Sequence, residues 1–508
     1  MKYQDILLKD RTAEPEQSSD VSEFFMDLNL DYIVSSITGK RREEYLEKLY
    51  LTPLRSFENI RFRQDVFRDL QREEILKATR EFSWEMSRVK RYLSGIGRLY
   101  RYQAERWLLD SVPIYCDCVT RFCKALRTSR PESEGLASFS RYLEQYVSSD
   151  SFQNLRKQAE RIITDLDGVR FKMVISPGKI RVSRCQNEPD LGQEIRELFS
   201  RFSSPKDQQI SRKYTRSGGM SHVEAAVLGM VAKLFPEPFD EMISFFEKNR
   251  NYIDEGIEDF HRGIQFYLSY IDFTDKFRNS GLSFCIPFIH ENRCETVLRE
   301  SFDLALAHNL LKTGGKVVTN DLSLNSGESI AVVTGPNHGG KTTFAKSVGQ
   351  VHYLASLGLP VPGKSASISV PDNIFTHFER EENIDNLRGK LEDDLFRIHQ
   401  IMEKATSRSL IIINEMLSST TLKDSLMLGK EILERIREKG TLCFYVTFID
   451  ELAEIGGVVS LVGSVSPEDP EVRTFRIERR PADGLAYAMA LARKYSLTHD
   501  DIIGRVGS

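Results

Sequence analysis

The sequence is poor in cysteine and has no long hydrophobic run. Its 508 residues include only seven cysteines, an odd number that argues against a disulfide framework and favours a reducing compartment. No stretch approaches the roughly 18 uninterrupted apolar residues of a membrane span. Residues 1–16 also lack the apolar core of a signal peptide. We therefore expect a cytoplasmic protein with no membrane partner.

Net charge is also small, but charge is unevenly distributed. A formal charge of −4 does not fit a wholly basic nucleic-acid-binding protein. Between Val169 and Arg216, however, eleven basic and five acidic residues give +6 over 48 residues. A solvated basic surface and a contact with a polyanion explain this bias about equally well. For the second case, the candidate nucleic-acid contacts are Arg170, Lys172, Lys179, Arg181, Lys206, Arg212, Lys213 and Arg216.

The most informative stretch is SIAVVTGPNHGGKTTFAK, from Ser329 to Lys346. A β-branched apolar run predicts a buried strand over 329–334, and a helix begins after the segment GPNHGGKT, which fits G-x-x-x-x-G-K-[ST]. In this order of strand, loop and helix, backbone amides and a helix N-terminus surround a phosphate. The predicted nucleotide-binding residues are Gly335, Pro336, Asn337, His338, Gly339, Gly340, Lys341, Thr342 and Thr343. Lys341 would reach the β- and γ-phosphates, and Thr342 would bind Mg²⁺.

Hydrolysis requires an acidic group beside the phosphate loop, and the segment LIIINE over 410–415 supplies a candidate. The carboxyl ends of buried parallel strands face the ligand. We therefore predict that Glu415 polarises the attacking water and that Lys341 is the second catalytic residue. Asn414 stands where an aspartate is expected, and its neutral amide is predicted to hold Mg²⁺ through bound water. Slow hydrolysis of ATP is the expected consequence.

Periodicity divides the chain into three predicted parts. Residues 1–45 form a lead-in. Residues 46–280 are largely helical, with breaks expected at prolines such as Pro113, and contain a basic, partly β element near 160–222 with a hairpin over 169–183. In residues 281–508 strands alternate with helices, which predicts an α/β P-loop ATPase domain with a mostly parallel sheet.

Several of these motifs resemble those of the MutS family of DNA mismatch-repair ATPases. The similar segments are Thr334–Thr343, Asn320-Asp321, Asn414-Glu415 with Ser418–Thr421, and Thr447–Leu452. The resemblance covers about 45–508, and it is specific in the ATPase half and moderate in the helical half. The resemblance implies an ABC-type ATPase domain that follows a helical lever and clamp, with ATP and Mg²⁺ as cofactors. It also implies a homodimer in which a second copy closes the nucleotide site, dimerisation helices at the C-terminal end, and DNA as the partner of the clamp.

The sequence departs from this family at several positions. Phe448 stands where the family has its switch histidine, and Gly389–Asp394 take the place of its Ser-Thr-Phe stretch. Only about 45 residues precede the helical core, so we expect no mismatch-reading domain. Phe239-Asp240-Glu241 has the spelling of the family's mismatch wedge, but it lies mid-chain after two prolines and is interpreted as a coincidence.

Three functions fit these observations. The first is a MutS-like ATPase that binds DNA through a clamp gated by ATP, in DNA mismatch repair or the recognition of other DNA structures. The second is the same motor directed to the ribosome or another RNA. The third is a nucleotide-gated adaptor with little hydrolysis, which Asn414 and Phe448 suggest. We prefer the first because the +6 stretch falls where the clamp would lie.

Overall fold

A computed structural model describes residues 3, 5–13, 23–39, 44–185, 220–292, 295–379, 389–466 and 473–482. Packing divides the chain into two compact units. The helical unit contains residues 1–4, 72–132 and 136–262, and the nucleotide unit contains residues 5–71, 133–135 and 263–508. The predicted domain limits at 45 and 280 stay predictions, since these units are not continuous in sequence. None of the helices among the described residues is long and apolar enough to cross a membrane.

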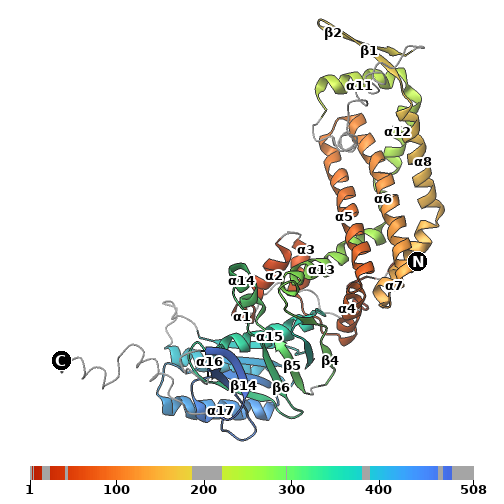
Figure 1. Cartoon of the computed structure of the whole chain (residues 1–508). Coiled ribbons are helices and arrows are strands. Elements are labelled where there is room, and N and C mark those ends of the chain that lie inside the picture. Colours follow the sequence, from red (N-terminus) through yellow and green to blue (C-terminus); the bar gives the residue numbers. More distant parts are fainter. Residues whose placement is uncertain are drawn as a thin grey trace. The chain divides into compact units, whose positions relative to one another are not determined.

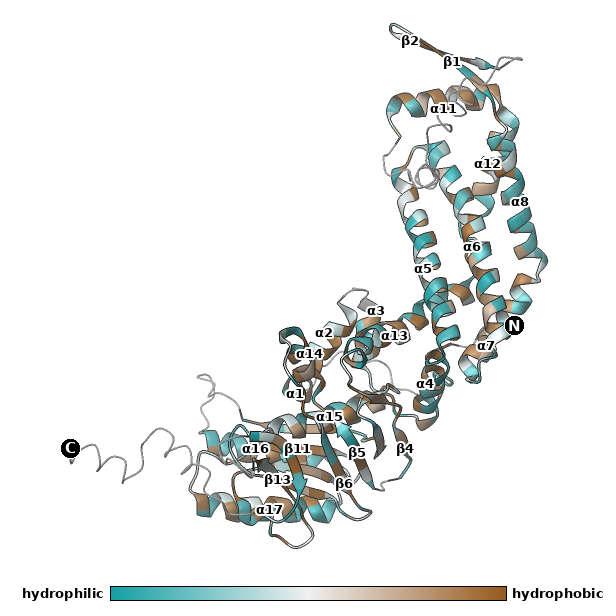
Figure 2. Cartoon of the chain, in the orientation of Figure 1, coloured by the Kyte–Doolittle hydropathy of each residue, from teal (hydrophilic) through white to brown (hydrophobic). Residues whose placement is uncertain are grey.

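Long amphipathic helices build the helical unit (Figure 1), and in Figure 2 they carry both hydrophilic and hydrophobic segments. Phe139 and Phe260 stack with their ring centroids 3.6 Å apart at the centre of its core. The helices are α5 (Glu73–Gly95), α6 (Arg101–Ser129), α7 (Glu134–Val147), α8 (Asp150–Asp167), α11 (His222–Leu234), α12 (Pro236–Lys248) and part of α13 (Glu255–Arg278), with the short η1 (Ile96–Arg98).

The break expected at Pro113 is wrong, because α6 continues through it. A proline inside a helix costs about 3 kcal/mol. The flanking side chains of Val112 and Tyr115 are fully buried, and α6 packs against α5, α8 and α12. Burial of the surrounding turns therefore outweighs the lost hydrogen bond.

A hairpin projects from the helical unit, as the turn signal at 176–178 predicts. Strands β1 (Phe171–Ser176) and β2 (Lys179–Arg184) pair antiparallel, from Phe171 opposite Arg184 to Ser176 opposite Lys179. Gly178 has a φ of 73° in the turn, a value that glycine adopts freely. The predicted hairpin is thus confirmed, and we call it the hairpin arm.

The main sheet of the nucleotide unit has the strand order β10-β11-β12-β7-β13-β14. All neighbours are parallel except β13 and β14, which confirms the mostly parallel sheet. Its strands are β7 (Ile330–Thr334), β10 (Ile374–Phe378), β11 (Leu410–Asn414), β12 (Leu442–Val446), β13 (Val459–Val465) and β14 (Arg473–Arg479). The helices of this region are α15 (Lys341–Ser356), α16 (Lys390–Lys404) and α17 (Leu422–Lys439), with the short η2 (Asp450–Leu452).

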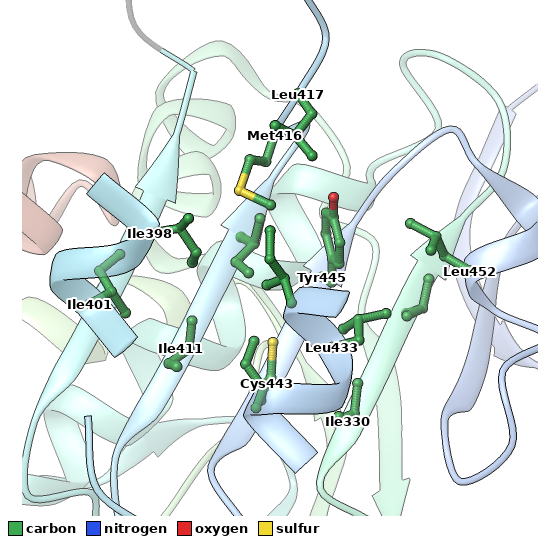
Figure 3. Close-up of a cluster of buried hydrophobic side chains, with 14 of the residues drawn as sticks. Ile330, Ile398, Ile401, Ile411, Met416, Leu417, Leu433, Cys443, Tyr445 and Leu452 are labelled. Atoms are coloured by element: carbon green, nitrogen blue, oxygen red, sulfur yellow. The ribbon is translucent and has the colours of Figure 1, made fainter. Parts of the chain in front are cut away.

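One core layer of this sheet is apolar throughout. Figure 3 shows Ile411 of β11 and Cys443 of β12 meeting side chains of α16 and α17 such as Ile398 and Leu433. Strands β7 and β11 are buried along their whole length. Their near-continuous apolar sequences reflect this cover on both faces. The ends of both strands are consequently fixed in position.

Smaller elements complete the nucleotide unit. A second sheet has the order β4-β9-β5-β6, and β3 pairs with β8. These strands are β3 (Phe284–Cys285), β4 (Phe288–His290), β5 (Thr296–Ser301), β6 (Asn320–Leu324), β8 (Val361–Pro362) and β9 (Ser365–Ser369). The further helices are α1 (Glu23–Asp27), α2 (Leu30–Thr38), α3 (Glu44–Leu51), α4 (Phe57–Leu70) and α14 (Leu304–Thr313).

Candidate functional site: a nucleotide pocket

The phosphate loop connects β7, in the interior of the main sheet, to the first residue of α15. Gly335 begins it with a φ of 117°, and a Cβ there would lie 2.9 Å from the backbone nitrogen of Gly463 on β13. Gly340 ends it with a φ of 90° at the N-cap of α15. Glycine is required at the first position for both conformation and space, and favoured at the second by conformation. The backbone conformation of the loop thus explains why the motif has glycine at these two positions.

Lys341 is the first residue of α15, and its side chain turns back into the loop. Its Nζ donates to Gly335 O at 2.8 Å and to Pro336 O at 3.0 Å. The ammonium also lies 4.5 Å from the centre of the Phe448 ring, within range of a cation–π contact. The residue is only 4% exposed, and burial lowers the pKa of Lys341 to about 8, although Glu415 and Asp450 oppose the shift. The lysine charge is therefore held by weak local partners that a phosphate can replace.

The second predicted motif meets the first at the end of β11. Thr342 Oγ1 donates to Asn414 Oδ1 at 2.8 Å, so two oxygen atoms lie side by side where Mg²⁺ is expected. Hydroxyl and amide oxygens are suitable ligands for this hard cation. Both are neutral, so phosphate oxygens and water must supply the negative charge and the other ligands. With those further ligands supplied, the Thr342 hydroxyl and the Asn414 amide oxygen fit a Mg²⁺ site.

Glu415 follows β11 and enters the same pocket. Its backbone N–H donates to Val446 O on the neighbouring strand at 3.0 Å, and its φ of 55° is left-handed. Burial raises the pKa of the Glu415 carboxyl, and Glu379 adds to the increase, while Lys341 and His338 oppose it. A carboxyl with a raised pKa is a better proton acceptor at neutral pH than an exposed one.

These residues share a cavity of about 690 Å³. Of the predicted residues it is lined by Asn337, His338, Gly339, Gly340, Lys341, Thr342, Thr343 and Glu415. Gly335 and Pro336 contribute through their carbonyls, which hold Lys341, and Asn414 through its bond to Thr342. The structure therefore gathers the whole predicted set, although the role of each residue stays a prediction.

Phe475 also lines the cavity, and no motif in the sequence points to it. Its φ of 58° is unusual for an aromatic residue. Asn320 holds this part of β14, because its amide donates to Phe475 O at 3.1 Å and accepts from the backbone N–H of Ile477 at 2.8 Å. In the sequence, Asn320-Asp321 is only a point of resemblance to the family, because the partner of Asn320 lies 155 residues away.

The predicted nucleic-acid contacts divide into two groups. On the hairpin arm, strand register places Lys172, Lys179 and Arg181 on one face. Arg170 precedes the arm, and its guanidinium donates to Asp167 O at the end of α8. Lys206, Arg212, Lys213 and Arg216 lie outside the described residues, as do the predicted C-terminal dimerisation helices.

Comparison with known proteins matches residues 331–471 to the family model described as MutS domain V. The chain is 31% identical over 192 residues to "Endonuclease MutS2" of Gemmatimonas aurantiaca. This match covers 37% of this chain and 23% of that protein. It is 32% identical over 158 residues to "DNA mismatch repair protein MutS" of Clostridium kluyveri, covering 30% and 18%. A longer match, 26% identical over 284 residues, joins 54% of this chain to 30% of the Clostridium botulinum protein of that name. Each match spans less than a third of the relative's own length.

Proposed function

We propose that this chain, whose residues 331–471 match the model of MutS domain V, is a MutS-family ATPase that couples ATP binding and hydrolysis to binding of DNA. The ATPase follows from an ABC-type domain whose phosphate loop and Glu415 line one cavity. DNA binding is inferred from the names of distant relatives and from the basic face of the hairpin arm. The proposal includes a cytoplasmic homodimer in which a second copy closes each nucleotide site, and a role in DNA mismatch repair or the recognition of another DNA structure.

In the nucleotide pocket, we assign binding to the phosphate loop and the start of α15. Loop amides and the helix N-terminus would surround the phosphates, and Lys341 would exchange its two carbonyl partners for phosphate oxygens. Thr342 and Asn414 would hold Mg²⁺, which supplies further neutralisation of phosphate charge when bound.

Glu415 is assigned to the hydrolytic step. Its carboxylate would orient a water molecule for attack on the γ-phosphorus and accept the proton that the water loses. The neutral Asn414 adds no negative charge beside the cation. We therefore expect hydrolysis to be real but slow.

For the hairpin arm, we propose contacts with DNA phosphates. Lys172, Lys179 and Arg181 project from the same face of a two-stranded ribbon, so their charges can follow one strand of a polyanion. Arg170 and the basic residues at 206–216 would extend this contact. Binding to phosphates is independent of base sequence and falls steeply with salt.

An adaptor with little hydrolysis is the second candidate. It is favoured by Phe448, whose ring covers the Lys341 ammonium at the position where the resemblance to the MutS family implies a histidine, and by the neutral Asn414. A phenyl ring cannot donate a hydrogen bond to the γ-phosphate.

ATP turnover decides between the two. We expect slow hydrolysis by the wild type, and retained ATP binding with a lower rate after Glu415→Gln. Equal background rates in both proteins would remove the enzymatic role of Glu415 and favour the adaptor.

DNA binding is tested by a gel-shift panel of duplex, junction and single-stranded DNA over a range of salt concentrations. A Lys172→Ala/Lys179→Ala/Arg181→Ala variant should bind less tightly than the wild type. A matched control removes three exposed charges elsewhere in the helical unit, Lys77→Ala/Arg91→Ala/Lys157→Ala. Absence of any salt-dependent affinity would exclude the DNA role, and ATP-dependent co-sedimentation with ribosomes would then favour the RNA-directed alternative.

A further inference from the structure

The nucleotide unit contains a second cavity besides the nucleotide pocket, which we call the α16 cavity. It encloses about 700 Å³, close to the 690 Å³ of the nucleotide pocket, and no residue that lines it also lines that pocket. Its walls come from α1, the segment before α4, the C-terminal end of α15, β10 with the segment before it, and α16 with the loop that follows. All of these belong to the nucleotide unit. A cavity of this size has room for a small molecule.

Hydrogen bonds between distant segments hold these walls together. The backbone N–H of Leu54 donates to Ser356 O at 2.9 Å, which joins the segment before α4 to the end of α15. Thr376 Oγ1 on β10 donates to Asp27 Oδ2 on α1 at 2.6 Å. Because both bonds join segments that are far apart in the sequence, the α16 cavity is formed by the tertiary fold and not by a single loop.

One part of the lining is apolar. The rings of Phe24, Phe57 and Phe375 line the α16 cavity and are half-buried. Ile60 and Tyr353, which also line it, are almost completely buried. Aromatic surface that is still partly in contact with water gains free energy when a flat apolar group covers it. The lining can therefore hold a planar apolar part of a ligand.

Arg397 of α16 adds a positive charge whose hydrogen-bonding capacity is not filled. Its side chain is only 11% exposed, and Nη1 donates to Phe378 O on β10 at 3.1 Å. Within the described part of the chain, Nη2 is buried without a hydrogen-bond partner, and the Glu23 carboxylate lies 3.9 Å from it. A buried N–H without an acceptor is unfavourable, and a carboxylate or phosphate oxygen is the acceptor that a guanidinium binds most strongly. Arg397 therefore favours an anionic ligand.

The remaining charged residues of the lining favour a ligand of the same sign. Three further basic residues line the α16 cavity and are exposed: Arg55, Lys404 and Arg408. The carboxylates of the lining are those of Glu23 and Asp372. Each Asp372 oxygen already accepts a hydrogen bond, from Thr406 Oγ1 at 2.6 Å and from Ser409 Oγ at 2.8 Å. Basic groups thus outnumber acidic ones, which gives the lining a positive potential.

We propose that the α16 cavity binds a small anionic ligand with a planar apolar part. Its carboxylate or phosphate group pairs with Arg397, and its ring packs against the three half-buried phenylalanine rings. The cavity is separate from the residues assigned to ATP and to DNA, so the inference does not depend on the function proposed above. Aromatic carboxylates and aromatic phosphates share this chemistry, and the experiment compares the two.

Fluorescence titration of the full chain with 1-naphthyl phosphate and with 1-naphthoate tests the proposal. The titrations are run with and without a saturating non-hydrolysable ATP analogue, which fills the nucleotide pocket. We expect saturable binding at one site per chain that the analogue does not prevent. Inorganic phosphate, which lacks the ring, and 1-naphthalenemethanol, which lacks the charge, should each bind at least about tenfold more weakly. The tighter of the two naphthyl anions identifies the anionic group.

Substitutions locate the binding site. Arg397→Gln should weaken binding of the tighter anion about tenfold, because the charge-assisted hydrogen bond is lost. Glu23→Gln should strengthen it about twofold, because a competing carboxylate is removed. Lys404→Ala/Arg408→Ala, at the exposed basic residues, should weaken binding about threefold at low salt and less at high salt. Arg435→Gln, an exposed arginine on α17, is the matched control and should bind like the wild type.

Several results would overturn the proposal. These are an absence of saturable binding by both anions, an equal affinity for the uncharged alcohol, and loss of binding when the ATP analogue is present. Affinity that is unchanged in Arg397→Gln would also overturn it. Should Arg397→Gln not fold, Lys404→Ala/Arg408→Ala decides the question, and wild-type affinity of that variant at low salt overturns the proposal.

Discussion

The nucleotide pocket and the hairpin arm are built in opposite ways. In the pocket, β7 and β11 are completely buried, and hydrogen bonds to the phosphate loop and to Asn414 hold the side chains of Lys341 and Thr342. On the arm, β1 is exposed along its length, with Phe171, Met173 and Ile175 exposed by 43%, 46% and 69%. The pocket should therefore depend on the position of single atoms, and the arm on its summed charge. Substitutions can test this contrast.

The largest effect is expected from Lys341→Ala. Its ammonium is the cation assigned to the phosphates, and alanine leaves none in its place. ATP binding should fall more than about a hundredfold in equilibrium titration, while DNA affinity without nucleotide stays unchanged. Lys430→Ala, an exposed lysine on α17, is the control. Near-normal ATP affinity in the Lys341 variant would contradict the pocket's assignment.

Two glycines with positive φ allow a direct comparison of the regions. A Cβ at Gly335 would lie 2.9 Å from a backbone nitrogen, whereas one at Gly178 in the arm would meet nothing within 4 Å. We expect Gly335→Ala to lower the free energy of unfolding by about 2–4 kcal/mol and Gly178→Ala by about 1 kcal/mol. Urea denaturation measures both. Equal losses would show that the positive φ alone sets the cost at both sites, and that the close packing around Gly335 adds nothing.

ATP affinity should depend on pH through Lys341. Its pKa of about 8 means that the lysine is charged below pH 8 and neutral above it. Affinity should thus be constant below this value and fall by up to about tenfold per pH unit above it. Titrations between pH 6.5 and 9.5 test this, with Lys341→Arg as the control whose charge does not change. A flat profile in the wild type would be inconsistent with the buried ammonium.

On the hairpin arm, the effects of removing single basic residues on DNA binding should add up. Removing two phosphate contacts by Lys179→Ala/Arg181→Ala should reduce the slope of log affinity against log salt by about 1.8, equally for all DNA sequences. Lys157→Ala on α8 should leave the slope unaltered. A loss confined to particular base sequences would indicate that the arm reads bases instead.

The smallest effect is expected from Phe448→Ala. Without its ring the Lys341 ammonium loses a contact worth about 0.5–1 kcal/mol, so ATP should bind two- to fivefold more tightly. Phe288→Ala, which removes an exposed ring elsewhere in the nucleotide unit, serves as the control. Weaker ATP binding after Phe448→Ala would mean that the ring contacts the nucleotide.

Much of the pocket could be predicted because its signals are local. The phosphate loop, its strand and its helix are neighbours in sequence, and β11 leads directly into Asn414 and Glu415. The hairpin arm was predictable for the same reason, since its turn and alternating strands lie within one short segment. The expected break at Pro113 is wrong because α6 is buried against helices that are distant in the sequence, and this burial outweighs the local effect of the proline.

By itself the sequence determined which residues carry the chemistry of nucleotide binding and where a basic ribbon would form. Only the tertiary structure decided that Phe448 covers Lys341, that Asn320 holds Phe475, and that Glu379 accepts a hydrogen bond from Ser418 in the turn beyond Glu415. Each of these pairs joins segments that are far apart in the sequence and that the order of the strands and the packing of the two sheets bring together. Because that order is set by the packing of the whole sheet, no local pattern of residues encodes it.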